Sequence, residues 1–313
     1  ALLNMETEVP HWNFEKTKKE TQGKWNKELS KIEVESITEE DAETFYTALY
    51  HTMLGPIIYE DVDGKYKGLD KNIHTSDGFT NYTIFSLWDT YRALHPLFNI
   101  IQTERNNDMI KSMLAHQKQS VHGMLPIWSH YANENWCMIG YHATSVIADA
   151  IAKNVGDFSK TDALNACIST SNVSYFDGIE SYIEKGFVPE DVSGSSVSKT
   201  LEFAYNDWCI AQVSDELNDV NTTKEYLKRS ESYRNLYDSK IGFMRPKLNN
   251  GNWKTPFDPM DTHGQGFIEG NAWNYGLYVP HQIDTMIEMM GGKDRFSLKL
   301  DSLFEIEIEE KYI

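Results

Sequence analysis

Apolar residues recur along most of this chain at the spacing of an amphipathic α-helix. One such run comprises Ala42, Phe45, Tyr46, Leu49, Tyr50 and Met53. These positions stand at i, i+3, i+4, i+7, i+8 and i+11, the stripe that one face of a helix presents. The same pattern returns at 143–151, 201–211 and 283–290, and in weaker form at 14–30, 84–98, 104–119, 160–170, 175–185, 222–237 and 293–304. We therefore predict roughly ten helices.

Strand signals are confined to short pieces. Residues 56–59 read Pro-Ile-Ile-Tyr and precede the turn-like sequence 61–64, so any sheet is expected to be small and local. No Pro-rich or Ser-rich linker divides the chain. The sequence therefore predicts an all-α domain of paired helices with small local β-hairpins, occupying residues 1–313.

Acidic residues outnumber basic ones, at 47 Asp and Glu against 29 Lys and Arg, which gives a net charge of −18. Such a surface repels phosphate backbones, so no nucleic-acid partner is expected. No apolar run approaches the roughly 20 residues of a membrane span, so none is predicted. The 3 cysteines form no CxxC pair, which indicates neither a disulfide framework nor a zinc site.

The densest cluster of chemically capable residues lies at 264–275. Glu269 stands there between glycines and is followed by Asn271, Trp273 and Tyr275. Glycines let a ligand approach the backbone closely, and aromatic rings around a carboxyl group raise its pKa, which suits it to proton donation near neutral pH. Glu269 is thus a candidate general acid. The alternative is that it only caps a helix that begins here.

A second cluster pairs Trp88 with Asp89. The indole offers an apolar face on which a sugar can stack, and the carboxylate can accept hydrogen bonds from two hydroxyl groups. The alternative is an ordinary helix in which Trp88 packs in the core and Asp89 pairs with Arg92 at i+3.

Two further groups of polar residues fall on predicted helices. His142 opens a helix that carries Asp149, and Glu202, Asn206 and Asp207 lie close together on another. Acids on a helix usually face solvent, so the three acids are weak candidates when taken singly.

Residues 61–63, Asp-Val-Asp, imitate the start of an EF-hand calcium loop. Asn72 stands where that loop would need a glutamate, so we interpret the segment as a turn. The chain lacks a phosphate-binding loop, a dinucleotide-binding fingerprint and a Gly-x-Ser-x-Gly elbow. Nucleotide-dependent and serine-hydrolase chemistry are therefore disfavoured.

Taken together and in order, several segments resemble glycoside hydrolase family 92, whose members are exo-acting α-mannosidases. The segments that carry the resemblance are 45–52, 61–64, 85–96, 138–142, 197–208, 255–259 and 269–275. The resemblance implies an (α/α)6 toroid, incomplete in this chain, with residues 1–35 as a linker helix that follows an absent N-terminal β-sandwich domain. It also implies a calcium cofactor, mannose-containing glycans as substrates, and a periplasmic, extracellular or cell-surface location.

The resemblance further implies hydrolysis with inversion, which needs a general acid on the leaving oxygen and a general base on the opposite face of the sugar. It places the general acid at Glu269. It places the substrate-binding residues at Trp88, Asp89, His142, Asn271 and Trp273.

The sequence departs from the family at its end. It stops at Ile313, whereas the segments that carry the family's general base and most of its calcium ligands would follow. The metal ligands are therefore unknown, and this chain alone is expected to be inactive.

The leading interpretation is a hydrolase of glycan degradation that releases terminal α-linked mannose, as an α-1,2-mannosidase. The first alternative is another inverting glycosidase on the same toroid, of trehalase or glucoamylase type, which would cleave an aryl glucoside rather than an aryl mannoside. The second alternative is a glycan-binding remnant, which would bind mannose without forming product.

Overall fold

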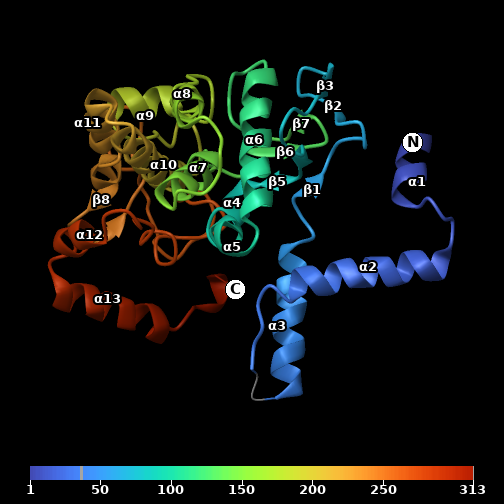
Figure 1. Ribbon diagram of the computed structural model, residues 1–313. Helices are drawn as coiled ribbons and strands as arrows, with labels where there is room; N and C mark the ends of the chain where they lie inside the picture. Colours follow the sequence, from blue (N-terminus) through green and yellow to red (C-terminus); the bar gives the residue numbers. More distant parts are fainter. Residues whose placement is uncertain (36–37, 313) are drawn as a thin grey trace. The chain divides into compact units, whose positions relative to one another are not determined.

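The structure of the protein, a computed structural model, describes residues 1–35 and 38–312 (Figure 1). Residues 36 and 37, and Ile313 at the end of the predicted domain, lie outside the described residues. The chain divides into two compact units. The first unit comprises residues 1–138 and 149–159, and the second comprises 139–148 and 160–313.

The first unit combines helices with very short strands. Its helices are α1 (Leu2–Glu8), α2 (Phe14–Leu29), α3 (Glu39–Thr52), α4 (Leu87–Thr90), α5 (Leu94–Ile101) and α6 (Thr103–Gln119). Its antiparallel sheets are β1 (Ile57–Ile58) with β4 (Tyr82–Thr83), β2 (Lys65–Lys67) with β3 (Ile73–Thr75), and β5 (Phe85–Ser86) with β6 (Trp128–His130) and β7 (Asn133–Glu134). Among the described residues no sheet exceeds three strands, which agrees with the prediction of small local sheets.

Helix α3 begins as its sequence predicts. The hydroxyl oxygen of Thr38 accepts a hydrogen bond from the backbone N–H of Asp41 at 3.1 Å, and three acids fill the first turn. Both features stabilise a helix N-terminus, the first by satisfying an unpaired donor and the second by complementing the helix dipole. Residues 1–35, for which we predict a linker helix, contain α1 and α2, neither of which has a buried side chain.

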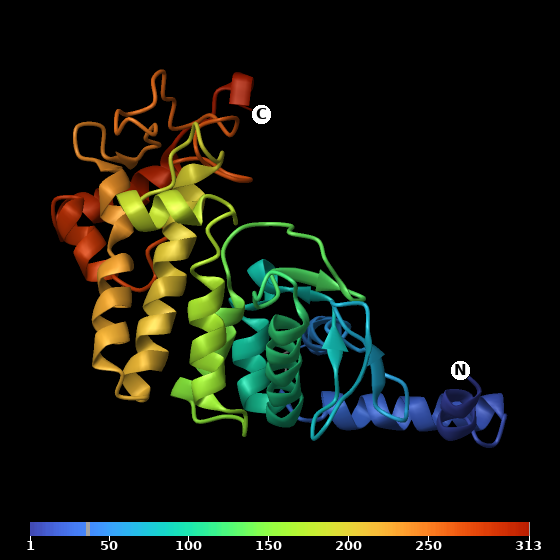
Figure 2. The same ribbon diagram turned by 90° about the horizontal axis from the view of Figure 1, so that it is seen from above.

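The second unit is organised around one long helix, α10 (Ser196–Glu216). It packs against α8 (Lys160–Thr170), α11 (Val220–Arg229) and η1 (Ser232–Leu236), and α10 and α11 lie side by side in Figure 2. The other elements are α9 (Ile179–Lys185), β8 (Tyr237–Asp238), β9 (Phe243–Met244), α12 (Ile283–Met289), α13 (Lys293–Glu305) and η2 (Glu310–Tyr312). Helix α7 (Ala143–Ala152) begins among the residues of the second unit and ends among those of the first.

The core of the second unit joins α10 to a long segment without regular structure. Val197, Leu201 and Ala204 of α10 pack in the same buried cluster as Phe267 and Ala272. A helix that is buried on several sides lies inside its domain rather than on the surface. Residues 264–278 are therefore attached to α10 by apolar packing.

The four strong helical stripes are confirmed as α3, α7, α10 and α12. The predicted helix at 84–98 is instead divided into β5, α4 and α5. Pro96 explains the division, because proline lacks an N–H group and fits only in the first turn of a helix. Helix α5 accordingly starts anew at Leu94.

The predicted helix at 222–237 is interrupted as well. Helix α11 ends at Arg229, and η1 follows. The hydroxyl of Ser230 donates to the carbonyl oxygen of Leu227 at 2.7 Å. Such a local hydrogen bond competes with continuation of the helix.

The helix that we expected beside Glu269 is only a turn. The side-chain oxygen of Asn271 accepts from the N–H groups of Trp273 and Asn274 at 2.9 and 3.3 Å, and Tyr275 N–H bonds to the Asn271 carbonyl at 3.0 Å. Turns follow instead of a helix as far as residue 277. The alternative role of Glu269 as a helix cap is therefore wrong for the described structure.

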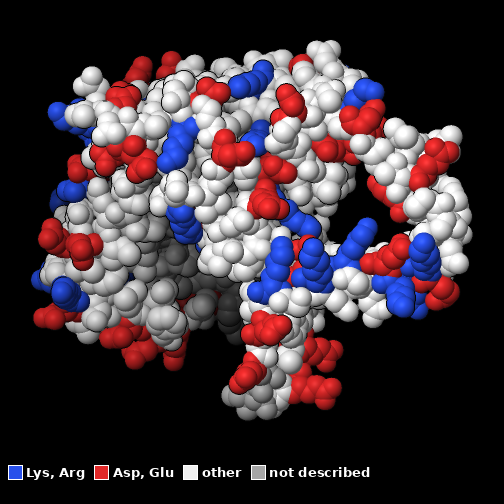
Figure 3. Space-filling view, viewed as in Figure 1, with Lys and Arg blue, Asp and Glu red and all other residues white. Residues whose placement is uncertain are grey.

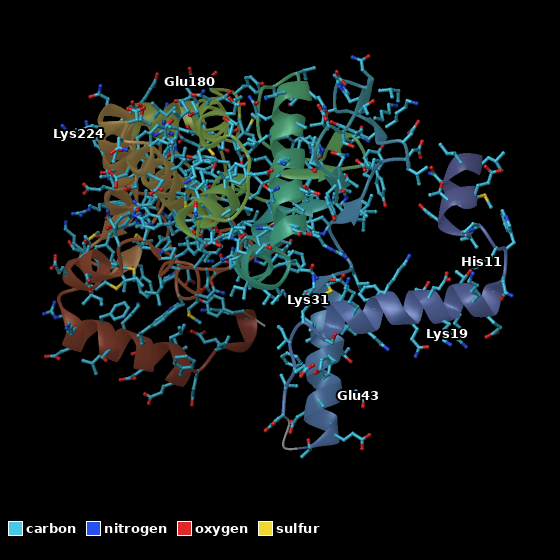
Figure 4. All side chains as sticks on the ribbon, viewed as in Figure 1. His11, Lys19, Lys31, Glu43, Glu180 and Lys224 are labelled. Atoms are coloured by element: carbon cyan, nitrogen blue, oxygen red, sulfur yellow. The ribbon has the colours of Figure 1, made fainter. Side chains whose placement is uncertain are left out.

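Acidic and basic side chains are interspersed over the face that Figure 3 shows, with acids gathered at the outer end of α3. Lys19 and Glu43 extend outward from α2 and α3 (Figure 4). Within the described ranges, no helix combines the length and the apolar character needed to cross a membrane.

His116 on α6 makes stability depend on pH. Its ring is buried against Phe85, with centroids 5.6 Å apart, and burial lowers its pKa to about 4. The unfolded chain takes up this proton near pH 6.5 whereas the folded protein does not, so the free energy of unfolding should fall between about pH 6.5 and 4. His116→Gln should reduce that slope by up to about 1.4 kcal/mol per pH unit.

Urea unfolding of the full-length protein at several pH values measures this slope. His263→Gln is the control, because the His263 side chain is 93% exposed, and it should leave the slope unchanged. An equal slope in the wild type and in His116→Gln would contradict the prediction.

Candidate active site

The candidate residues divide between the two units. Trp88 and Asp89 lie on α4 in the first unit. The candidates of the second unit are His142, Glu269, Asn271 and Trp273.

Trp88 and Asp89 are held by their neighbours in the chain. Ser86 donates its hydroxyl proton to Asp89 Oδ2 at 2.5 Å. The guanidinium carbon of Arg92 lies 4.3 Å from the centroid of the Trp88 ring, and Arg92 Nε donates to the Trp88 carbonyl at 3.1 Å. Trp88 is partly buried and Asp89 is exposed. The pair thus offers an oriented indole and an accessible hydrogen-bond acceptor.

The segment that carries Glu269 is pinned to the first turn of α10. The carbonyl oxygen of Gly266 accepts from the N–H groups of Val197 and Ser198 at 2.9 and 3.1 Å, and Ile268 N–H donates to Ser198 Oγ at 3.1 Å. Gly266 has φ +88°, and a Cβ atom there would lie 2.9 Å from side-chain atoms of both Pro246 and Val197. Only glycine fits this position without strain.

Glu269 follows directly after this anchor. Its backbone has φ +46°, a left-handed conformation that is uncommon for residues other than glycine. Its side chain is exposed. Two aromatic groups expected around this carboxyl group have partners elsewhere: Tyr275 donates its hydroxyl proton to Glu202, and Trp273 packs against Phe243 with ring centroids 5.0 Å apart.

Asn271 and Trp273 both contact other residues of the protein. Asn271 closes the turn described above and donates its amide to the Met260 carbonyl at 2.9 Å. Lys299 Nζ lies 3.8 Å from the centroid of the Trp273 ring. Burial lowers the pKa of Lys299 to about 8, and the ring faces attract the cation.

His142 directly precedes α7 and contacts buried polar side chains of α10. His142 Nε2 lies 2.8 Å from Glu202 Oε2, with 1% and 0% of the two side chains exposed, and His142 Nδ1 lies 3.0 Å from the amide nitrogen of Asn206. Tyr275 completes the cluster through its bond to Glu202. Sequence reasoning treated Glu202 as a weak candidate and did not connect Tyr275 to it.

Asp207 has a separate set of partners. It accepts from the hydroxyls of Tyr141 and Tyr182 at 2.7 and 2.8 Å and from Arg229 Nε at 3.0 Å. Burial raises the pKa of Asp207, while Arg229 and the two hydroxyls oppose that shift. Because all these groups are satisfied within the core, the arrangement serves structure.

Clustered carboxylates are common side-chain ligands of calcium. Calcium takes about six to eight oxygen ligands. In residues 1–35 and 38–312, no three His, Cys, Asp or Glu side chains come together in a way that could hold a metal ion. Residues 61–64 form the predicted turn, in which Gly64 N–H donates to the Asp61 carbonyl at 2.8 Å and Asp63 pairs with Lys65 at 2.5 Å.

The chain is similar to known glycosidases over most of its length. The profile of the glycosyl hydrolase family 92 catalytic domain matches residues 1–312. A family GH92 alpha-mannosidase from Bacteroides thetaiotaomicron has a TM-score of 0.94 and 46% identity, covering 97% of this chain and 40% of that one. A family GH92 inverting mannosidase from the same species has a TM-score of 0.90 and 32% identity, covering 96% and 42%.

An uncharacterized secreted glycosidase of Arthroderma benhamiae is 25% identical over 98% of this chain and 40% of its own length. The chain thus spans about 40% of the length of these two relatives.

Gly266→Ala should loosen the segment that carries Glu269. The variant combines a left-handed backbone, which costs about 1–2 kcal/mol for other residues, with a steric clash that typically adds about 1–3 kcal/mol. Gly264→Ala is a matched control, because Gly264 also has a positive φ but its Cβ would meet only Lys254 Nζ at 4.0 Å. Thermal unfolding of the full-length variants should show the larger loss for Gly266→Ala, and equal losses would contradict the packing described here.

Proposed function

Because the chain belongs to glycosyl hydrolase family 92, we propose that the full-length protein releases terminal α-linked mannose from glycans. The observation that carries this proposal is the match across residues 1–312. It is supported by 46% and 32% identity to two solved proteins of the family, described as an alpha-mannosidase and an inverting mannosidase.

The proposed reaction is hydrolysis with inversion. One carboxylic acid protonates the leaving oxygen while another carboxylate activates a water molecule on the opposite face of the sugar, about 6.5–9.5 Å away. Glu269 is the proposed acid. Its carboxyl group is exposed to an incoming substrate, while the backbone before it is fixed to α10 through Gly266 and Ile268.

The proposed substrate contacts begin with two residues of α4. Trp88 would stack against a sugar ring and Asp89 would accept hydrogen bonds from its hydroxyl groups. His142, Asn271 and Trp273 are the other proposed contacts. Hydrogen bonds to the rest of the protein hold His142 and Asn271 in place for these contacts.

Further features of the proposal follow from the family resemblance. They are α-1,2 linkage preference, an (α/α)6 toroid that includes this chain, an N-terminal β-sandwich domain in the same parent chain, calcium as cofactor, and a location outside the cytoplasm. The secreted glycosidase among the relatives supports the last of these. The ion would bind the sugar and help distort its ring.

Glu269→Gln should abolish proton donation without changing the size of the side chain. Loss of a general acid typically costs about 10²–10⁴-fold in rate. In the full-length enzyme, we expect a loss of this size with a mannobiose, whose leaving group needs a proton. A dinitrophenyl mannoside, whose leaving group needs none, should lose much less.

Initial-rate measurements on the two substrates make this comparison, with an aryl glucoside as a test of sugar specificity. Equal losses on both mannosides would remove Glu269 from the acid role. Hydrolysis of the glucoside in preference to the mannosides would overturn the proposed substrate class.

Trp88→Ala and Asp89→Ala should each weaken substrate binding and turnover together, because both residues are proposed to hold the terminal sugar in place. We expect kcat/KM to fall by about tenfold to hundredfold. Trp12→Ala is the matched control, since Trp12 is also in the first unit and 64% exposed, and it should leave the kinetics unchanged. Unaltered KM and kcat in both test variants would place these residues outside the site.

A further inference from the structure

Three polar residues of α10 share one face of the helix. Ser198, Glu202 and Asn206 stand at i, i+4 and i+8, which places them one above the other. None of them has exposed surface. Burial of polar groups is costly unless they are hydrogen-bonded, so the contacts of this stripe are a structural requirement.

Asn206, the last residue of the stripe, determines which ring nitrogen of His142 accepts a hydrogen bond. Asn206 Oδ1 accepts from the backbone N–H of Tyr141 at 2.8 Å, which turns the amide nitrogen toward His142 Nδ1, 3.0 Å away. An amide nitrogen only donates, so Nδ1 is the acceptor and the ring proton sits on Nε2. Nε2 lies 2.8 Å from Glu202 Oε2.

The two carboxyl oxygens of Glu202 face different residues. The hydroxyl of Tyr275 donates to Oε1, and His142 Nε2 lies 2.8 Å from Oε2. A hydrogen bond to a side chain without exposed surface is formed in surroundings of low dielectric, where it is stronger than in water. Tyr275 is thereby fixed to α10 more firmly than an exposed turn residue would be.

The stripe holds the chain on both sides of Glu269. Before Glu269, Ser198 Oγ accepts from Ile268 N–H at 3.1 Å. After Glu269, Glu202 holds Tyr275. Phe267 and Ala272 reinforce the two attachments by packing in the core with α10. The left-handed backbone of Glu269, with φ +46°, persists because its flanks are fixed in this way.

We infer that Tyr275, held by Glu202 and through it by His142, is a positioning residue that sets the direction of the Glu269 carboxyl group. This inference rests on the proposed role of Glu269 as general acid. Proton transfer requires the donor to be within hydrogen-bond reach of the leaving oxygen, so a small displacement of Glu269 slows that step. Neither Tyr275 nor Glu202 needs to touch the substrate.

The test compares two substrates in the full-length enzyme. Tyr275→Phe and Glu202→Gln each keep the size of the side chain while weakening the bond between them. Each should lower kcat on a mannobiose by roughly tenfold to hundredfold, and each should lower kcat on a dinitrophenyl mannoside by less than about threefold, because the latter needs no proton from Glu269. KM should change little.

Tyr226→Phe is the matched control for stability. Tyr226 is a buried tyrosine of the second unit, whereas Tyr275 is partly buried. The Tyr226 hydroxyl bonds to Ser171 at 2.6 Å and to Asn172 at 3.0 Å. It lies on α11, and these two partners of its hydroxyl lie outside residues 264–278. The Tyr226→Phe variant should have a lower unfolding temperature. Its change in kcat should be the same for the two substrates.

The outcomes separate this inference from the proposed function. If Glu269→Gln shows the substrate difference but Tyr275→Phe and Glu202→Gln reduce both rates equally, as a loss of folded enzyme would, the positioning role is wrong and the general acid stands. If Glu269→Gln shows no substrate difference, the acid assignment fails and the positioning role fails with it.

Discussion

Glu202 is a carboxylate with no exposed surface in the middle of a helix. A polar group in such a place is tolerated only when hydrogen bonds within the protein replace those that it has lost to water. Tyr275 donates a hydrogen bond to Glu202, and His142 Nε2 lies 2.8 Å from its other oxygen. The two residues lie far from Glu202 in the sequence, one on either side. One buried carboxylate therefore joins three segments of the second unit.

This constraint explains how a segment without regular structure can hold the proposed general acid, Glu269, in place. Residues 264–278 are held by backbone bonds at Gly266, by Ser198 and by Glu202, all of which lead to α10. Asp207 on the same helix has its own donors, so the two acids do not compete for partners. Sites on rigid elements are more precise than sites on free loops, and here the helix supplies the rigidity to the loop.

The sequence predicted most helices because their apolar stripes depend on neighbours within a few residues. It also predicted the turn at 61–64 and the small size of the sheets, for the same reason. It missed the break at Pro96 and the lone turn at Asn271, where a missing N–H or a side-chain oxygen outweighs periodicity. Both breaks can be recognised from the residue types, because proline lacks a backbone donor and an Asn side chain can accept from the backbone.

The candidate site was less predictable. The residues beside Glu269 in the sequence identified it as a candidate. Its exposure and its attachment to α10, however, depend on contacts between residues that are distant in the sequence. Glu202 was judged a surface acid because helical acids usually face solvent. The available signal was the spacing of Ser198, Glu202 and Asn206 within a helix that is apolar on its other faces, which indicates a buried polar stripe.

Amide hydrogen exchange of residues 264–278, in the full-length wild type and in Glu202→Gln, tests most directly whether α10 holds this segment. The account predicts slow exchange at Ile268 and Tyr275 in the wild type, because their N–H groups are bonded within a fixed segment. Exchange should become faster in Glu202→Gln while α11 stays protected. Exchange at the rate of an unstructured peptide in the wild type, or unchanged protection in the variant, would contradict the account.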